Sequence, residues 1–189
     1  MGRYLLAAAL SVAALLGQEF KLGSKVDDFA LRDTSGGEVQ FASLRGPVTV
    51  VIFIATKCPV SNSYNERMSA IYKDYNARGV KFVFVNSNHN EPLEEVAQHA
   101  RDHFSFAVYK DTDNVVADRF GASVTPEAFV LDSTGTIRYH GSIDDSQVVQ
   151  RVQENRLRNA LDAVLASKPV DQAETKAFGC SIKRIRKAS

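Results

Sequence analysis

The sequence predicts an α/β fold in which a central mixed β-sheet is flanked by helices on both faces. Three observations support this prediction. Val48–Ile54 and Val80–Asn86 are almost continuously apolar, as strands covered on both faces usually are. A segment with helical periodicity separates them, and the order strand, helix, strand predicts a parallel pair. Ala128–Asp132 and Thr136–Gly141 flank a turn-forming Asp-Ser-Thr-Gly sequence, which predicts an antiparallel hairpin with the second strand at the sheet edge.

The segments between and after these strands have the spacing and end signals of helices. We expect helices over Ser61–Ala77, Glu91–His103, Asp113–Phe120 and Asp144–Ala166, with a short strand near Phe104–Tyr109. Acidic residues favour the positive end of a helix, so the acidic pair that opens the last and longest of these helices is explained as a cap.

The chain of 189 residues fits one domain with short extensions. In residues 1–17, Arg3 precedes the apolar run Tyr4–Leu16, which is typical of a secretory signal peptide. The run is shorter than the ~20 residues of a membrane span, so we expect no stable membrane insertion, with a retained N-terminal anchor as the alternative. The domain would cover residues 18–166 and a tail residues 167–189. A periplasmic or secreted location follows.

Charge and cysteine content limit the partners. The chain carries 23 Lys and Arg against 22 Asp and Glu, so no global field recruits nucleic acid, and we expect no nucleic-acid partner. Cys58 and Cys180 are 122 residues apart and have no histidine at a ligand interval, so no metal site is expected. No motif implies a bound cofactor.

Cys58 is the strongest candidate for a reactive group. It lies where the strand Val48–Ile54 gives way to the helix at Ser61. Free backbone N–H groups and the positive end of a helix stabilise a thiolate, and Lys57 adds a favourable charge. We therefore expect a lowered pKa and a nucleophilic thiol. The alternative is a buried structural cysteine.

Several segments carry a family resemblance. Cys58-Pro59-Val60-Ser61 resembles the active-site C-x-x-C of the thioredoxin superfamily with serine in place of the second cysteine, and Val124–Glu127 resembles its threonine–cis-proline loop. Tyr139–Asp145 is similar to a segment of redoxins of the alkyl hydroperoxide reductase and thiol-specific antioxidant group. Gly179–Lys183 is similar to the Gly-Cys-Ser-Ile-Lys segment of a peroxiredoxin-like subgroup. The resemblance implies a thioredoxin fold and a thiol-dependent, peroxiredoxin-like oxidoreductase.

The resemblance also implies roles for individual residues. Cys58 would attack a peroxide or a disulfide, and Thr125 with a cis Pro126 would face it and bind substrate. Ser61 removes the local dithiol, so Cys58 must be resolved elsewhere. Thr56 offers a hydroxyl to the thiolate. The peroxiredoxin pattern P-x-x-x-T-x-x-C is not matched, because its proline and threonine positions hold Val51 and Ala55 here.

Cys180 is the only internal candidate for the resolving thiol. The 14 residues that separate it from Ala166 span at most about 46–50 Å, enough to reach Cys58. A sulfenic acid on Cys58 would condense with Cys180, and an external thiol reductant would restore both thiols. A permanent structural disulfide and two free thiols are the alternatives. The rival functions are thiol–disulfide exchange on exported proteins and a redox-inactive binding module.

The remaining polar motifs receive structural interpretations. His89 lies in a polar loop after Val80–Asn86 and is expected to be solvent-exposed. His99 and His103, one helical turn apart, are expected to form a surface pair. The basic residues Lys183–Lys187 are expected to form a solvated, disordered terminus, with contact to acidic partners or lipid headgroups as the alternative.

Overall fold

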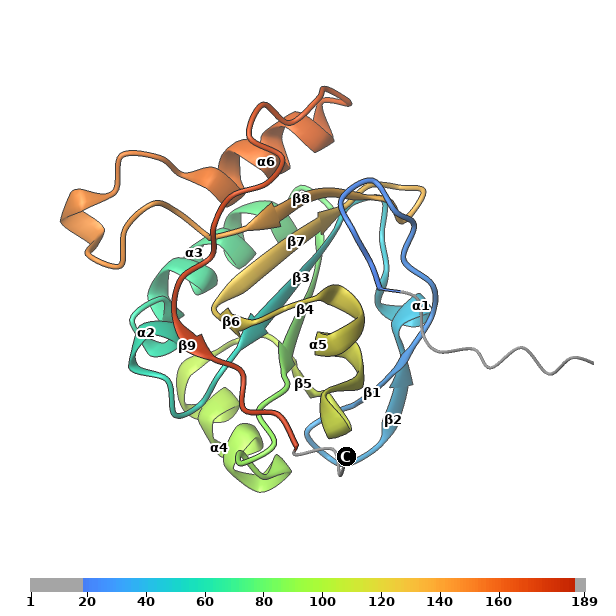
Figure 1. Cartoon of the computed structure of the whole chain (residues 1–189), viewed down its shortest axis with the longest axis vertical. Coiled ribbons are helices and arrows are strands. Elements are labelled where there is room, and N and C mark those ends of the chain that lie inside the picture. The colour runs from blue at the N-terminus through green and yellow to red at the C-terminus, as the bar shows by residue number, and fades with distance from the viewer. Residues whose placement is uncertain (1–18, 186–189) are drawn as a thin grey trace, which may run out of the picture.

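One seven-stranded mixed sheet runs through the centre of the computed structural model, which describes residues 19–185 (Figure 1). Its strand order is β2-β1-β5-β4-β3-β7-β8. The strands are β1 (Ala30–Arg32), β2 (Glu38–Gln40), β3 (Thr49–Ile54), β4 (Lys81–Asn86), β5 (Val108–Lys110), β7 (Glu127–Leu131) and β8 (Ile137–Gly141). β4 pairs in parallel with β3 and β5, and the other pairs are antiparallel. The predicted parallel pair, the hairpin and the edge position of its second strand are confirmed.

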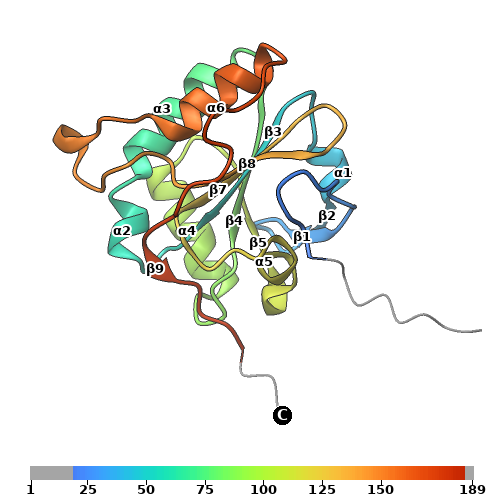
Figure 2. The same cartoon turned by 45° about the horizontal axis from the view of Figure 1, so that its top comes forward.

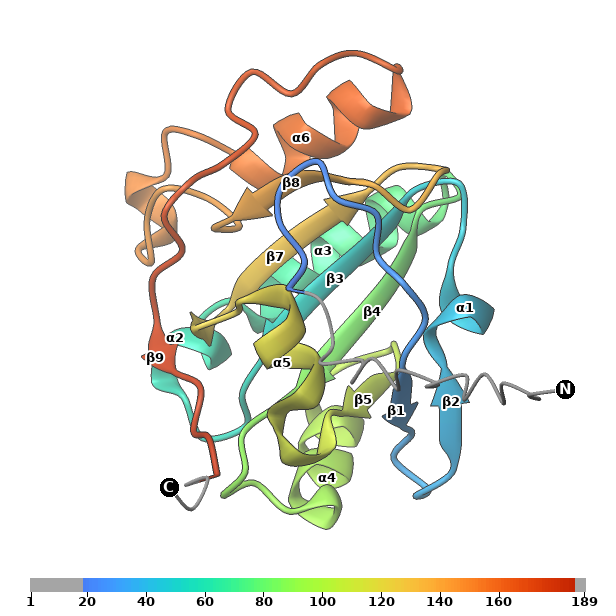
Figure 3. The same cartoon turned by 45° about the vertical axis from the view of Figure 1, so that its right-hand side comes forward.

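Helices cover both faces of the sheet, as predicted. They are α1 (Phe41–Leu44), α2 (Pro59–Asn62), α3 (Asn65–Asn76), α4 (Leu93–His103), α5 (Val115–Phe120) and α6 (Arg156–Leu165), with 3₁₀ turns η1 (Thr112–Asn114) and η2 (Val149–Arg151). α3 and α6 lie side by side on one face (Figure 2), and α5 lies on the opposite face (Figure 3). The sheet is the middle layer of three.

Two apolar cores explain why β3 is apolar at every position after Thr49. Val50 and Ile52 pack against α3, α4 and α6, whereas Val51 and Phe53 pack against α1 and α5. Successive side chains of a strand point to opposite faces, so a strand inside a three-layer fold presents apolar side chains to both layers. All six residues of β3 are buried.

The helix predicted over Asp144–Ala166 is wrong in its first half, because α6 begins at Arg156. Asp144 is 3% exposed and its carboxylate accepts hydrogen bonds from Tyr64 Oη (2.7 Å) and Arg67 Nη1 (2.6 Å). Asp145 accepts a bond from the Gln153 backbone. The two acids therefore fix a loop instead of capping a helix, since a buried ion pair outweighs the local preference.

The helix predicted over Ser61–Ala77 forms as two, and starts earlier than expected. α2 begins at Pro59, directly after Cys58, and is one turn long. The backbone then turns at Ser63, whose N–H donates to Pro59 O at 3.0 Å, before α3 begins. Cys58 therefore faces the start of a single turn and not of a long helix.

The tail after α6 returns along the sheet edge to the start of α2 (Figures 1 and 3). Glu174 forms a bridge with His140 of β8, and β9 (Cys180–Ser181) pairs antiparallel with β6 (Val124–Thr125). Phe178 packs against the core under α3, and Ile182 is buried in the core under α5. Tail residues 167–185 are thus part of the fold.

Lys183 and Arg184 are exposed, as expected, but the expected disorder is wrong for Lys183–Ile185, because these residues make backbone and side-chain contacts with the domain. Its remaining two residues, like the proposed signal peptide at 1–17, lie outside the described residues. Within residues 19–185 no helix is both long and apolar enough to span a membrane.

Candidate active site around Cys58 and Cys180

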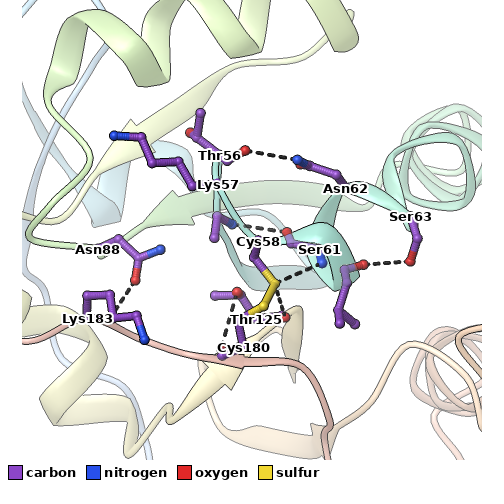
Figure 4. The surroundings of a disulfide bond; sticks show 12 residues. Thr56, Lys57, Cys58, Ser61, Asn62, Ser63, Asn88, Thr125, Cys180 and Lys183 are labelled. Atoms are coloured by element: carbon purple, nitrogen blue, oxygen red, sulfur yellow. Dashed lines mark hydrogen bonds between the residues drawn. A yellow bond between two sulfur atoms is a disulfide. The ribbon is translucent and has the colours of Figure 1, made fainter.

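Cys58 occupies the N-cap of α2, between the end of β3 and Pro59 (Figure 4). Its Sγ accepts a hydrogen bond from Ser61 N at 3.2 Å and lies 3.6 Å from Thr125 O. The side chain is 4% exposed and forms a disulfide with Cys180, with the two Cα atoms 5.9 Å apart. The two cysteines are therefore brought together across 122 residues of sequence.

Ser61 stands where a second cysteine would stand, and it stabilises the turn. Its hydroxyl accepts a hydrogen bond from Ala55 N at 3.0 Å, across the loop that joins β3 to α2. Its own N–H is the donor to Cys58 Sγ. This backbone N–H would also stabilise a Cys58 thiolate.

Thr125 and Pro126 lie on the other side of the disulfide. The peptide bond between them is cis, as the resemblance implied. Thr125 pairs with Cys180 in the β6–β9 ladder, and its hydroxyl donates to Cys180 O at 3.5 Å. The segment that precedes the cis proline is therefore already paired with a strand of the same chain.

Glu127, which sequence reasoning missed, supports this segment from behind. Its carboxylate accepts hydrogen bonds from the N–H groups of Ser123 (2.7 Å) and Val124 (3.2 Å) and contacts His140 Nε2 at 2.6 Å. His140 in turn stacks on Phe129. The sequence signal for this role is the acidic residue directly after Thr125-Pro126, at the start of an apolar strand. A carboxylate buried there needs hydrogen-bond donors from the neighbouring segment.

Thr56 and Lys57 differ from their expected roles. The Thr56 hydroxyl lies 3.5 Å from Asn86 Nδ2, and the Thr56 carbonyl accepts a bond from Asn62 (Figure 4). Lys57 Nζ forms an ion pair with Glu95 at 2.5 Å. Glu95 therefore offsets the charge that Lys57 was expected to offer to Cys58.

The histidines do not form a second centre. The His89 side chain is exposed, as expected. His99 and His103 form the expected pair, with ring centroids 4.6 Å apart, but only His103 is exposed. His99 is half-buried, and its Nε2 lies 3.0 Å from Asn62 Oδ1. Burial and the charge of His103 lower the pKa of His99. Among residues 19–185, no three His, Cys, Asp or Glu side chains gather where they could hold a metal ion.

The structure thus gathers Cys58, Ser61, Thr125, Pro126 and Cys180 and leaves Thr56 to one side. The two sulfur atoms lie where one bond can form and break between them, beside a backbone donor. A thiolate at one position can attack an electrophilic sulfur or a peroxide oxygen, and the other thiol can then close the disulfide.

Comparisons with known proteins agree with this geometry. The family model described as AhpC/TSA family matches residues 22–140. The thiol-disulfide oxidoreductase ResA of Bacillus subtilis is 28% identical over 116 residues, which cover 61% of this chain and 64% of that protein. A probable phospholipid hydroperoxide glutathione peroxidase of Nicotiana tabacum is 30% identical over 61 residues, 32% of this chain and 36% of that protein. The crystal structure of a hypothetical protein from Sinorhizobium meliloti matches with a TM-score of 0.80 and 32% identity, covering 89% of this chain and 97% of that one.

Proposed function

The chain belongs to the AhpC/TSA family, and we propose that it is an exported thiol-dependent oxidoreductase that cycles between a dithiol and the Cys58–Cys180 disulfide. One observation carries the proposal. The disulfide joins the N-cap of α2 to the strand that pairs with the segment before the cis proline. The signal-like segment at residues 1–17 supports export, because disulfides persist in oxidising compartments.

The substrate class that the site favours is a disulfide. The Cys58 thiolate attacks one sulfur of the substrate, forms a mixed disulfide and releases the other sulfur as a thiolate. The Cys180 thiolate then attacks Cys58 Sγ and releases the second substrate thiolate. The substrate gains two electrons, and the two protein thiols become one disulfide. An external thiol reductant then reduces this disulfide back to the two thiols. The likeness to the thiol-disulfide oxidoreductase ResA over 116 residues and the C-x-x-S arrangement support this order of steps.

A peroxide is the second candidate substrate, favoured by the likeness to the tobacco peroxidase. Cys58 would attack a peroxide oxygen and become a sulfenic acid, with release of water or an alcohol. Condensation with Cys180 would then release water and give the same disulfide. The site argues less for this reaction, because Ala55 holds the position of the peroxiredoxin threonine and the Thr56 hydroxyl lies beside Asn86.

The decisive experiment follows the reduced protein and its Cys180→Ser variant with two oxidants, glutathione disulfide and hydrogen peroxide. We expect a Cys58 pKa below the ordinary value of about 8.5, fast reaction with glutathione disulfide, and a mixed disulfide that persists only in Cys180→Ser. A persistent sulfenic acid formed faster by peroxide would assign the second candidate. An ordinary pKa with slow oxidation that does not depend on Cys180 would leave only a structural bridge.

A further inference from the structure

The loop Asn86–Glu91, at the carboxyl end of β4, contacts the segments of both cysteines. On one side it meets the turn before Cys58. Glu91 is 1% exposed, and its two carboxylate oxygens accept hydrogen bonds from Thr56 N (2.9 Å) and Lys57 N (2.8 Å). These are the two residues that precede Cys58, so the carboxylate fixes the direction in which the chain enters the N-cap of α2.

On its other side the same loop holds the chain beyond Cys180. Asn88 is 5% exposed, and its Oδ1 accepts a hydrogen bond from Lys183 N at 2.7 Å (Figure 4). The backbone N–H of His89 donates to Lys183 O at 2.8 Å. The backbone N–H and the carbonyl of Lys183, three residues after Cys180, are therefore both hydrogen-bonded to this loop. The Lys183 side chain takes no part in these two bonds.

A buried polar network holds the loop in place. Asn86 Nδ2 donates to Glu91 Oε2 at 2.5 Å, and Lys110 Nζ donates to Asn86 Oδ1 (2.8 Å) and to Asn88 O (2.6 Å). Burial lowers the pKa of Lys110, while the charges of Glu91 and Asp111 oppose that shift. Such a network rigidifies the groups that it connects, because each buried member needs its partners.

We propose that the Asn86–Glu91 loop is a two-sided clamp that positions both thiols. Glu91 fixes the turn before Cys58, and Asn88 binds the chain after Cys180 and so keeps Cys180 next to Cys58. This inference rests on the proposed function. It concerns the second step of that function, in which the Cys180 thiolate attacks Cys58 Sγ. None of the clamp bonds involves a sulfur atom. The clamp therefore holds Cys180 beside Cys58 in the dithiol state as well, and raises the effective concentration of the resolving thiol.

The first test measures the equilibrium constant of the Cys58–Cys180 disulfide against glutathione. Asn88→Ala leaves Lys183 N without its acceptor and frees the tail in the dithiol state, so the effective concentration of Cys180, and with it the constant, should fall about tenfold. Asn88→Asp keeps the Oδ1 acceptor and should restore most of the constant. Asn90→Ala is the matched control, because Asn90 is exposed in the same loop and contacts Lys57 only through its carbonyl.

The second test separates the two sides of the clamp in a Cys180→Ser background. Glu91→Gln removes the buried charge and one acceptor beside the Cys58 turn, so the midpoint of the pH profile for alkylation of Cys58 should move to lower pH. Asn88→Ala should leave that midpoint unchanged, because its contact lies beyond Cys180. If Glu91 has a purely structural role, Glu91→Gln would lower the stability of the protein without moving the midpoint.

An unchanged disulfide constant in Asn88→Ala, or equal loss in Asn88→Ala and Asn88→Asp, would overturn the clamp. So would an unchanged midpoint in Glu91→Gln. The disulfide constant does not depend on which oxidant the protein uses. The clamp can therefore fail while the proposed function stands, and the substrate assignment can fail while the clamp stands.

Discussion

Thr125 and Cys180 are paired residues of the antiparallel β6–β9 ladder, so the second cysteine reaches Cys58 on a strand and not on a free tail. Thr125 O also lies 3.6 Å from Cys58 Sγ, which places one residue in contact with both halves of the disulfide. The family resemblance assigns the pairing of substrate main chain to this same segment. On the proposed function, a protein substrate that pairs with this segment would have to displace β9.

Reduction of the disulfide should lower the free energy of unfolding. The bond closes a loop of 122 residues, and removing such a constraint from the unfolded chain costs about 2–5 kcal/mol. Urea unfolding with and without reductant measures the difference. The double variant Cys58→Ser/Cys180→Ser is the control and should not respond to reductant. Equal midpoints in the native protein would show that the bridge does not constrain its unfolded state.

Gly179→Ala should weaken the disulfide without touching either cysteine. A Cβ at this position would collide with Thr125 O, because β9 approaches β6 here through backbone alone. We expect overpacking to displace Cys180 and to lower the disulfide equilibrium constant against glutathione about tenfold or more. Ser181→Ala, at an exposed position of β9, should leave the constant unchanged. A native constant in Gly179→Ala would contradict the close pairing.

Asp132 should contribute stability that depends on pH. Partial burial disfavours its charged form, but hydrogen bonds from Thr134, Arg138 and Thr136 outweigh that effect and hold the pKa of Asp132 at about 2. A carboxylate whose pKa is lower in the folded than in the unfolded chain stabilises the fold at pH values above its unfolded-state pKa. This stabilisation is lost as the pH falls through the folded-state pKa.

Asp132→Asn should therefore cost about 2 kcal/mol at pH 7, and the deficit should shrink between about pH 4 and pH 2. Urea unfolding of both proteins across this range measures it. A deficit that stays constant down to pH 2 would show that lost hydrogen bonds, and not the charge, cause the effect.

Arg67→Ala should be strongly destabilising. The side chains of Arg67 and Asp144 are 16% and 4% exposed and form an ion pair at 2.6 Å, and Arg67 also donates to the carbonyls of Ser146 and Gln147. Its loss leaves a buried carboxylate without its cation, which costs about 3–5 kcal/mol.

Arg78→Ala is the matched control, because the pair of Arg78 with Asp162 is about half exposed on both sides. It should change the unfolding free energy by less than about 1 kcal/mol. Similar losses in the two variants would mean that burial does not distinguish the two pairs.

The central layer of the fold could be predicted because its signals are local. The two apolar strands and their crossover helix, the Asp132–Gly135 turn and the residue pattern at Cys58 are each contained in one short window. The short strands β1 and β2 carry too few residues for a period to show, and they were not anticipated. The helix over Asp144–Ala166 failed because Asp144 finds Arg67 and Tyr64, 77 and 80 residues away.

The sequence by itself determined the α/β class, the two cysteines and the placement of Cys58 at a strand-to-helix junction. Only the tertiary structure decided which partner Cys58 has, because the pairing of β9 with β6 and the contacts of Glu91, Asn88 and Glu127 join segments that are distant in the chain. Local patterns report the face that a residue presents to its neighbours. The partner of a buried polar group is set by the whole packing arrangement, in which every such group must find a donor or an acceptor.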